Sequence, residues 1–194
     1  SSDVCSSDLL LQHYHDRLPP EQRTVLLGDI QRSTRNMADL MEQVLLLGRV
    51  EAGRLGFRPQ PLDLDSLARK LTDETLSATH RRCPIVWTCQ GDLSGAWGDE
   101  SLLRHIVSNL LSNGVKYSPP DSVVHLSAVR ENSAVILTVR DEGIGIPVEE
   151  KGRMFEAFHR CTNVGEIPGT GLGLVIVKRC VDLHGGTIDF QSEP

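Results

Sequence analysis

The chain has 194 residues, of which 39% are hydrophobic and 24% are charged, and its formal net charge is −6. This length and composition allow one sizeable hydrophobic core with a helical extension. The acidic balance and the scattered basic residues argue against a nucleic-acid-binding surface. No run approaches the ~20 apolar residues of a membrane span, so we expect no membrane contact by this chain. The five cysteines, at 5, 83, 89, 161 and 180, lack the spacing of a metal site and suit reduced thiols in the cytoplasm, even if a longer protein were membrane-anchored.

The first fifty residues predict the end of one helix, to about residue 17, and then a second, long helix. Residues 1–9 resemble a translated sequencing adapter, and we expect them to be a non-native tail. Pro19, Pro20 and Glu21 then mark a helix start, and the helix should continue to about residue 50. Two sets of residues recur at intervals of seven within it: Ile30, Met37 and Val44, and Leu27, Thr34 and Met41. This repeat favours the seam of a helical bundle, although any amphipathic core helix would also satisfy it.

The remainder of the chain predicts a mixed α/β domain. Glycines and prolines at 53–62 indicate a linker, and Asp63 is a plausible N-cap for a helix to about residue 79. Further helices are predicted near 99–113 and 171–184, and strands near 84–89, 122–130, 133–140 and 186–191. The predicted fold class is therefore an α/β two-layer sandwich, preceded by part of a helical hairpin.

The helix near 99–113 carries two amides one turn apart on one face. Asn109 and Asn113 could supply oxygen ligands to Mg²⁺, because hard cations prefer oxygen and the i, i+4 spacing aligns the two side chains. Lys116 could reach phosphate oxygens from the next turn, and Tyr117 offers a flat ring for a base. An ordinary core helix with solvated amides is the alternative interpretation.

A carboxylate and two glycines follow the apolar run 135–140, which indicates a buried strand. A buried Asp141 could accept a hydrogen bond from the exocyclic amine of adenine, whereas guanine would leave two acceptors facing each other at a cost of about 1–3 kcal/mol. Gly143 and Gly145 would let the backbone approach the base, and Pro147 would stiffen the exit. A surface turn is the alternative.

A glycine-rich loop at 169–173 precedes the last predicted helix, which Gly185 and Gly186 close. Helix N-termini attract anions, so nucleotide phosphates are the natural ligands of this loop. The glycines do not match the dinucleotide-binding pattern, and the chain has no Gly-Lys-Ser/Thr phosphate loop.

These segments, in this order, resemble the sensor histidine kinases of bacterial two-component systems. Residues 109–118 are similar to the N box, 141–147 to the G1 box, 155–160 to the F box and 169–174 to the G2 box of that family. The resemblance extends upstream to the second helix of the HisKA-type dimerisation domain and covers about residues 10–194. It implies a GHKL (Bergerat) ATPase fold preceded by a partial dimerisation domain.

The resemblance implies ATP and Mg²⁺ as cofactors and a role for each matched residue. Asn113, with Asn109, would hold Mg²⁺, while Phe155 and Phe158 would pack a mobile lid over the nucleotide. Gly114 replaces the alanine usual in the family. The nucleotide-binding set is Asn109, Asn113, Lys116, Tyr117, Asp141, Gly143, Gly145, Ile146, Phe158, Arg160, Gly169, Thr170, Gly171, Leu172, Gly173 and Leu174.

The family's phosphoacceptor motif, His-Glu/Asp-x-Arg, is not found in the sequence, so no catalytic residue is assigned. His13 and His15 lie too close to the predicted turn, and neither begins the full motif: Tyr14 follows His13, and Leu18 stands where the motif after His15 needs arginine. We therefore expect a piece truncated at both ends: part of the dimerisation domain at 10–52, a linker at 53–62, and an ATP-binding domain at 63–194 without its last strand.

The resemblance implies that the parent protein autophosphorylates a histidine and passes the phosphate to a response regulator's receiver domain, acting as a homodimer. The chain alone would bind ATP without autophosphorylation. Alternatives are another GHKL kinase or ATPase, such as an anti-sigma-factor serine kinase, or a non-catalytic nucleotide-binding module.

Overall fold

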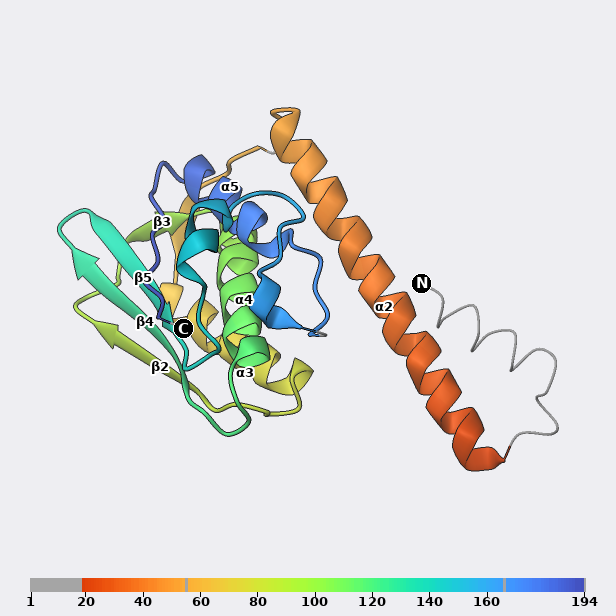
Figure 1. The fold of residues 1–194 in the computed structure, drawn as a ribbon. Coiled ribbons are helices and arrows are strands. Elements are labelled where there is room, and N and C mark those ends of the chain that lie inside the picture. Colours follow the sequence, from red (N-terminus) through yellow and green to blue (C-terminus); the bar gives the residue numbers. More distant parts are fainter. Residues whose placement is uncertain (1–18, 55, 166, 194) are drawn as a thin grey trace. The chain divides into compact units, whose positions relative to one another are not determined.

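The computed structural model describes residues 19–54, 56–165 and 167–193 (Figure 1). The chain divides into two compact units, with the division between Gly48 and Arg49. The predicted tail at 1–9, together with His13 and His15, lies outside the described residues. Among the described residues, no helix is long and apolar enough to cross a membrane.

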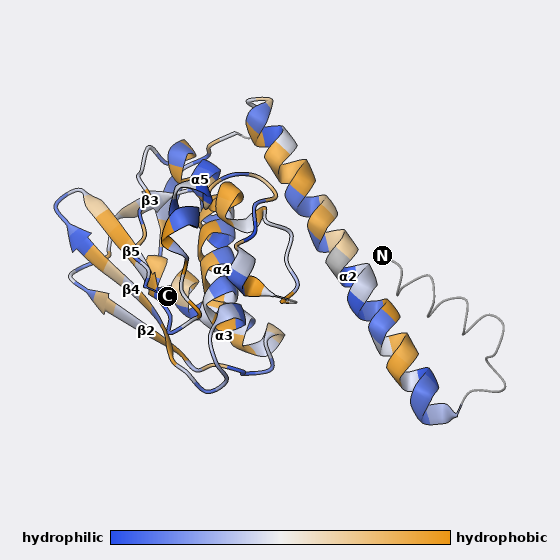
Figure 2. Ribbon diagram, viewed as in Figure 1, coloured by the Kyte–Doolittle hydropathy of each residue, from blue (hydrophilic) through white to orange (hydrophobic). Residues whose placement is uncertain are grey.

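The first unit contains all but the last three residues of the helix α2 (Pro20–Glu51), so the long helix predicted from the sequence is confirmed. Pro20 occupies its first position, where a missing N–H costs nothing, and Glu21 stabilises the positive end of the helix dipole. Hydrophobic residues recur along its whole length (Figure 2). Several of them have largely exposed side chains: Val25, Leu27, Met37, Leu40, Met41, Val44 and Leu45.

The second unit is a two-layer α/β sandwich, and the predicted fold class is confirmed. The helices α3 (Leu64–Ala78), α4 (Glu100–Tyr117) and α5 (Gly173–Leu183) lie on one side of a three-stranded sheet (Figure 1). In this sheet β2 (Ile85–Gln90) runs parallel to β4 (Val124–Glu131), which pairs antiparallel with β5 (Ala134–Arg140). A two-stranded sheet joins β1 (Gln60–Leu62) to β3 (Ala96–Gly98). Two short 3₁₀ helices, η1 (Val148–Arg153) and η2 (Thr162–Val164), lie between β5 and α5.

The core lies between the helices and the sheet. It is formed by apolar residues of α3, α4 and β4, with Cys83 among them: Leu67, Ala68, Leu71, Cys83, Val107, Leu111, Val115, Val124 and Leu126. Both α3 and α4 begin at an aspartate cap. Asp63 accepts a hydrogen bond from the Ser66 N–H, as the sequence predicted, and Asp99 accepts bonds from Ser101 and Leu102. This core fixes the C-terminal half of α4, on which the candidate site depends.

Three predicted elements differ from the structure. The helix near 99–113 continues to Tyr117, so Lys116 and Tyr117 belong to its last turn. The strand β5 is not buried: its residues alternate between exposed and half-buried, because it is an edge strand with one face toward solvent.

The strand predicted at 186–191 is not formed by the described residues. Burial alternates there as in a strand, but the segment is anchored through Ser192 rather than through a backbone ladder with β5. The Ser192 hydroxyl accepts a hydrogen bond from the Ile146 N–H at 2.9 Å. The backbone carbonyl oxygen of Ser192 accepts one from the Lys151 ammonium at 2.6 Å.

Candidate functional site

The two amides of α4 face the start of α5. The Asn109 amide nitrogen donates to the His105 carbonyl oxygen at 2.8 Å. Its Oδ1 lies 2.8 Å from the position that a Cβ atom on Gly173 would take, and the Asn113 Nδ2 lies 4.0 Å from that position. The first residue of α5 therefore lies directly against both predicted Mg²⁺ ligands.

A second group of site residues gathers around Gly169. A Cβ atom there would lie 2.6 Å from Lys116 Nζ, 3.6 Å from the Tyr117 hydroxyl and 3.9 Å from Arg160 Nε. The Lys116 ammonium is also 4.7 Å from the centre of the Tyr117 ring, within the range of a cation–π contact. The Arg160 guanidinium donates to the Ile167 carbonyl oxygen. Two positive charges thus flank the beginning of the glycine loop.

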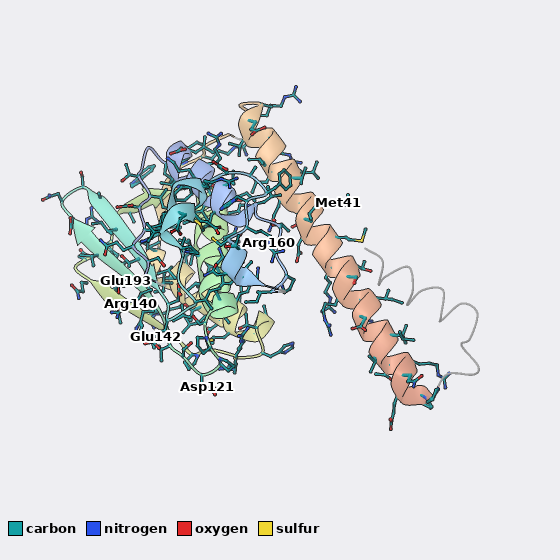
Figure 3. The ribbon with its side chains drawn as sticks, in the orientation of Figure 1. Met41, Asp121, Arg140, Glu142, Arg160 and Glu193 are labelled. Atoms are coloured by element: carbon teal, nitrogen blue, oxygen red, sulfur yellow. The ribbon has the colours of Figure 1, made fainter. Side chains whose placement is uncertain are left out.

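The turn after β5 lies beside the end of α4. The Gly143 N–H donates to Asp141 Oδ1 at 2.9 Å, and the Ile144 N–H donates to the Tyr117 carbonyl oxygen at 3.2 Å. A Cβ atom on Gly143 would lie 3.1 Å from that same carbonyl oxygen, so only glycine lets the two backbones meet. Asp141 is exposed rather than buried as predicted, because it follows an edge strand. Its chain neighbours Arg140 and Glu142 are labelled in Figure 3.

The Gly114 that replaces the family's alanine has a local explanation. A Cβ atom on it would lie 3.1 Å from Val124 Cγ1 and 3.5 Å from the Cβ atom of Asp141. The glycine therefore brings α4 close to the start of β4 and to the carboxylate of the turn.

Backbone contacts join the two parts of the predicted lid, the segment around Phe158 and the glycine loop at 169–173. The Phe158 N–H donates to the Gly171 carbonyl oxygen at 3.1 Å. Gly171 has φ +70°, and a Cβ atom on it would lie 2.7 Å from the His159 carbonyl oxygen. Thr170 Oγ1 accepts the Leu172 N–H at 3.2 Å. These contacts hold the glycine loop at the start of α5.

The aromatic residues of the predicted lid behave differently from each other. Phe155 packs edge-on against Phe190, with ring centres 6.0 Å apart. The Phe158 side chain is 66% exposed, so the expectation that its ring packs the lid is wrong. A positive φ of 63° at Phe158 turns the chain there, and only its backbone N–H contributes to the closure.

The remaining predicted residues contribute through their backbone or lie partly buried. Gly145 has φ +67°, and its carbonyl oxygen accepts the Asn163 amide at 3.0 Å. The Leu172 side chain is fully buried, so only its backbone could face a ligand, whereas Leu174 and Ile146 are half-buried.

Asn163 and Ser192 support the turn after β5, and the sequence analysis missed both. Their contacts with Gly145 and Ile146 span 18 and 46 residues of sequence, so no local pattern could have indicated them.

Two hollows on the second unit lie away from these residues. One is lined by the β1 region and the loop at 91–96, and the other by residues near Gly56 and the start of α4. Neither hollow includes Asp141, Asn113 or Gly169. The candidate site is therefore defined here by its converging side chains and glycines.

Comparison with protein families gives the class of protein. The family described as "Histidine kinase-, DNA gyrase B-, and HSP90-like ATPase" matches residues 98–194, which is half of the chain and includes every candidate residue above. The chain belongs to this family.

The curated relatives narrow the class to sensor histidine kinases, as the sequence boxes predicted. The circadian input-output histidine kinase CikA of Synechococcus elongatus is 34% identical over 192 residues, covering 96% of this chain and 25% of CikA. The signal transduction histidine-protein kinase/phosphatase MprB of Mycolicibacterium paratuberculosis is 33% identical over 185 residues, covering 91% of this chain and 33% of MprB. The chain thus spans a quarter to a third of these relatives.

Solved structures agree with the fold. Full-length ShkA in complex with AMPPNP superposes with a TM-score of 0.71 at 27% identity, covering 94% of this chain and 37% of ShkA. The Acinetobacter baumannii histidine kinase AdeS, at 21% identity, superposes with a TM-score of 0.74 over 98% of this chain and 89% of AdeS, and supports the fold alone.

Proposed function

We propose that ATP with Mg²⁺ binds along the C-terminal half of α4, between the turn after β5 and the start of α5. One observation carries this proposal: Tyr117 joins the two groups of residues. Its carbonyl oxygen accepts the Ile144 N–H of the turn, and its hydroxyl lies beside Gly169 of the glycine loop. The base site and the phosphate site are therefore contiguous.

The Asp141 carboxylate is assigned to the adenine amine. Its Oδ1 accepts the Gly143 N–H, which orients the carboxylate, and Oδ2 would accept the hydrogen bond from the ligand. An amine donor from adenine would complete the pairing, whereas the carbonyl of guanine would face another acceptor. This arrangement predicts selectivity for ATP over GTP.

The two α4 amides fit a Mg²⁺ site. Because the Asn109 amide nitrogen donates to His105, its Oδ1 is the atom that faces Gly173, and an amide oxygen is a suitable ligand for a hard cation. Asn113 would add a second amide oxygen after a rotation of its side chain. When bound, the ion would neutralise phosphate charge.

Positive groups near the glycine loop are assigned to the phosphates. Lys116 and Arg160 lie beside Gly169, and the loop leads directly into the N-terminus of α5, where the helix dipole favours anions. These groups would position the terminal phosphate by charge alone, which is the main protein contribution to phosphoryl transfer.

Autophosphorylation and phosphate relay are proposed for the longer protein. There, the ATP-binding domain at 63–194 would supply the γ-phosphoryl group to a histidine, and a response regulator would accept it on an aspartate. The described chain would bind ATP without labelling itself. Incubation with γ-labelled ATP should leave this chain unlabelled, whereas a longer chain carrying an upstream His-Glu/Asp-x-Arg motif should acquire acid-labile label.

Calorimetric titration of the chain with ATP and GTP, each with and without Mg²⁺, tests the binding proposal. We expect saturable, Mg²⁺-assisted binding of ATP only, weakened about tenfold or more by Asp141→Ala. Glu142→Ala is the matched control, because it removes the adjacent exposed carboxylate and should leave affinity unchanged. Equal binding of both nucleotides, or loss of binding in both variants, would contradict the assignment.

A further inference from the structure

Three side chains with metal-binding atoms converge between the turn after β5 and the glycine loop, and none of them is a proposed Mg²⁺ ligand. Glu150 comes from η1, while His159 and Cys161 lie on either side of Arg160. Each residue offers one possible ligand atom, and these three atoms lie within 4.8 Å of one another. The cluster therefore links the segment after the β5 turn to the segment that leads into the glycine loop.

The cluster is buried and its polar atoms are incompletely paired. The side chain of His159 is 9% exposed and that of Glu150 is 13% exposed. His159 Nε2 faces Glu150 Oε2 at 3.4 Å, but among the described residues neither atom makes a hydrogen bond. Buried polar atoms seldom remain unsatisfied, because an unpaired group costs about 1–3 kcal/mol. The facing imidazole nitrogen and carboxylate oxygen thus have capacity for a shared ligand.

The other contacts of the cluster hold it in a suitable shape. Glu150 Oε1 accepts the Thr162 hydroxyl at 2.6 Å and the Thr162 N–H at 3.0 Å. These hydrogen bonds fix the carboxylate through Oε1, and its other oxygen, Oε2, lies 3.4 Å from His159 Nε2. The Cys161 thiol donates weakly to the Met154 sulfur at 3.4 Å. Outer contacts of this kind orient the inner ligands of metal sites.

We propose that Glu150, His159 and Cys161 bind one Zn²⁺ ion. Zinc takes nitrogen, thiolate and carboxylate ligands, with bonds of about 2.0–2.3 Å that place neighbouring donors about 3.3–3.6 Å apart in a tetrahedron. The separation of His159 Nε2 and Glu150 Oε2 already matches this spacing, and the three residues offer donor atoms within 4.8 Å of one another. Binding replaces the thiol proton, which is released to solvent, and water takes the fourth position.

The ligand set separates this site from the Mg²⁺ site. Thiolate and imidazole favour zinc over magnesium, which prefers oxygen ligands. A metal bound here would connect η1 to the segment 158–161, which includes Phe158 and Arg160. It would therefore restrict the motion of the segment that leads into the glycine loop. The spacing of the five cysteines matches no metal motif and therefore predicted no metal site. Only Cys161 belongs to this cluster, and the other two donors are the side chains of Glu150 and His159.

Zinc and cobalt titrations of the metal-free chain test the proposal. Cys5 and Cys89 are first replaced by serine in every variant, because Cys89 is exposed and Cys5 lies outside the described residues. We expect one Zn²⁺ per chain in competition with a chromophoric chelator. Cobalt should give a sulfur-to-metal charge-transfer band and the intense visible absorption of tetrahedral coordination, whereas Mg²⁺ should not compete.

Substitutions identify the ligands. Cys161→Ser, His159→Gln and Glu150→Gln should each weaken zinc binding by at least about tenfold, the scale on which even outer contacts act. Cys161→Ser should also remove the charge-transfer band. Circular dichroism shows whether each variant folds, and Glu150→Gln retains an acceptor for Thr162.

Three results would overturn the proposal. They are the absence of stoichiometric zinc binding by folded protein, unchanged affinity in Cys161→Ser, and a cobalt spectrum without the sulfur band. Failure of the ATP titrations would not affect it, since none of the three ligands is assigned to the nucleotide.

Discussion

Asn109 Oδ1 lies 2.8 Å from the position that a Cβ atom would occupy on Gly173. This closeness couples the start of α5 to the amide pair of α4, so the end of the glycine loop and the proposed Mg²⁺ ligands cannot move independently. It also explains the third glycine of the loop, because any side chain at this position would displace the amide.

Gly173→Ala should weaken ATP binding without lowering the free energy of unfolding. The added methyl group meets the end of a side chain, so Asn109 can rotate away at little cost, and alanine in place of glycine favours the helix by up to about 1 kcal/mol. We expect an unchanged or slightly higher free energy of unfolding in urea. Mg²⁺-dependent ATP affinity should fall about tenfold or more, because a ligand oxygen has been displaced. Unchanged affinity would show that Asn109 does not contact the ion.

Gly171→Ala should loosen the lid. Its methyl group would meet the backbone of Phe158 and His159 at 2.7 Å, and a positive φ costs alanine about 1–2 kcal/mol. Gly185→Ala is the matched control: its φ is +69°, but a Cβ atom there has nothing within 4 Å. Amide exchange of the Phe158 N–H should accelerate in Gly171→Ala and remain unchanged in Gly185→Ala. Equal exchange in both variants would argue against the backbone contact.

Asp99 should matter more to stability than a typical helix cap. It is buried and accepts hydrogen bonds from the N–H groups of Ser101, Leu102 and Arg58. Asp99→Ala leaves these donors unpaired and should cost about 2–3 kcal/mol. The exposed cap Asp63 accepts a hydrogen bond from the Ser66 N–H, so Asp63→Ala should cost about 1 kcal/mol. Urea unfolding measures both, and similar losses would contradict the role assigned to Asp99.

Alkaline pH should destabilise the chain through Cys180. Burial, with a smaller effect of the nearby Asp99 carboxylate, raises the pKa of this thiol to about 11. The folded state therefore holds the thiol proton more tightly than the unfolded state, whose thiol titrates near pH 8.5. The resulting stability is complete below the unfolded value and is lost as pH rises toward 11. Free energies of unfolding between about pH 8 and pH 11 should fall less steeply for Cys180→Ala. If the free energy of unfolding fell equally with pH in the unmodified chain and in Cys180→Ala, Cys180 would not be the group responsible.

Much of the fold could be predicted from local patterns, while the contacts of the site could not. The periodicity of the helices and the cap at Asp63 are short-range features, and the structure confirms them. The edge position of β5 depends on the pairing order of the sheet, so the exposure of Asp141 could not be inferred from its apolar run. Phe158 combines a positive φ with a largely exposed side chain, and no local pattern predicted either feature.

Long-range contacts also explain what the sequence analysis missed around the site. The glycine boxes predicted which residues approach the nucleotide, but the supports at Asn163 and Ser192 arise only when distant segments meet. The cluster of Glu150, His159 and Cys161 is similar, since its donors are 2 to 11 residues apart in sequence and match no regular motif.

The central claim is that Asp141 recognises the exocyclic amine of adenine, and a calorimetric cycle tests it most directly. ATP and the purine riboside triphosphate that lacks this amine are titrated into the unmodified chain and into Asp141→Ala. We predict that the unmodified chain prefers ATP by about tenfold or more and that Asp141→Ala shows almost no preference. A preference for ATP that survives in Asp141→Ala would contradict the account, because the amine would then be recognised elsewhere.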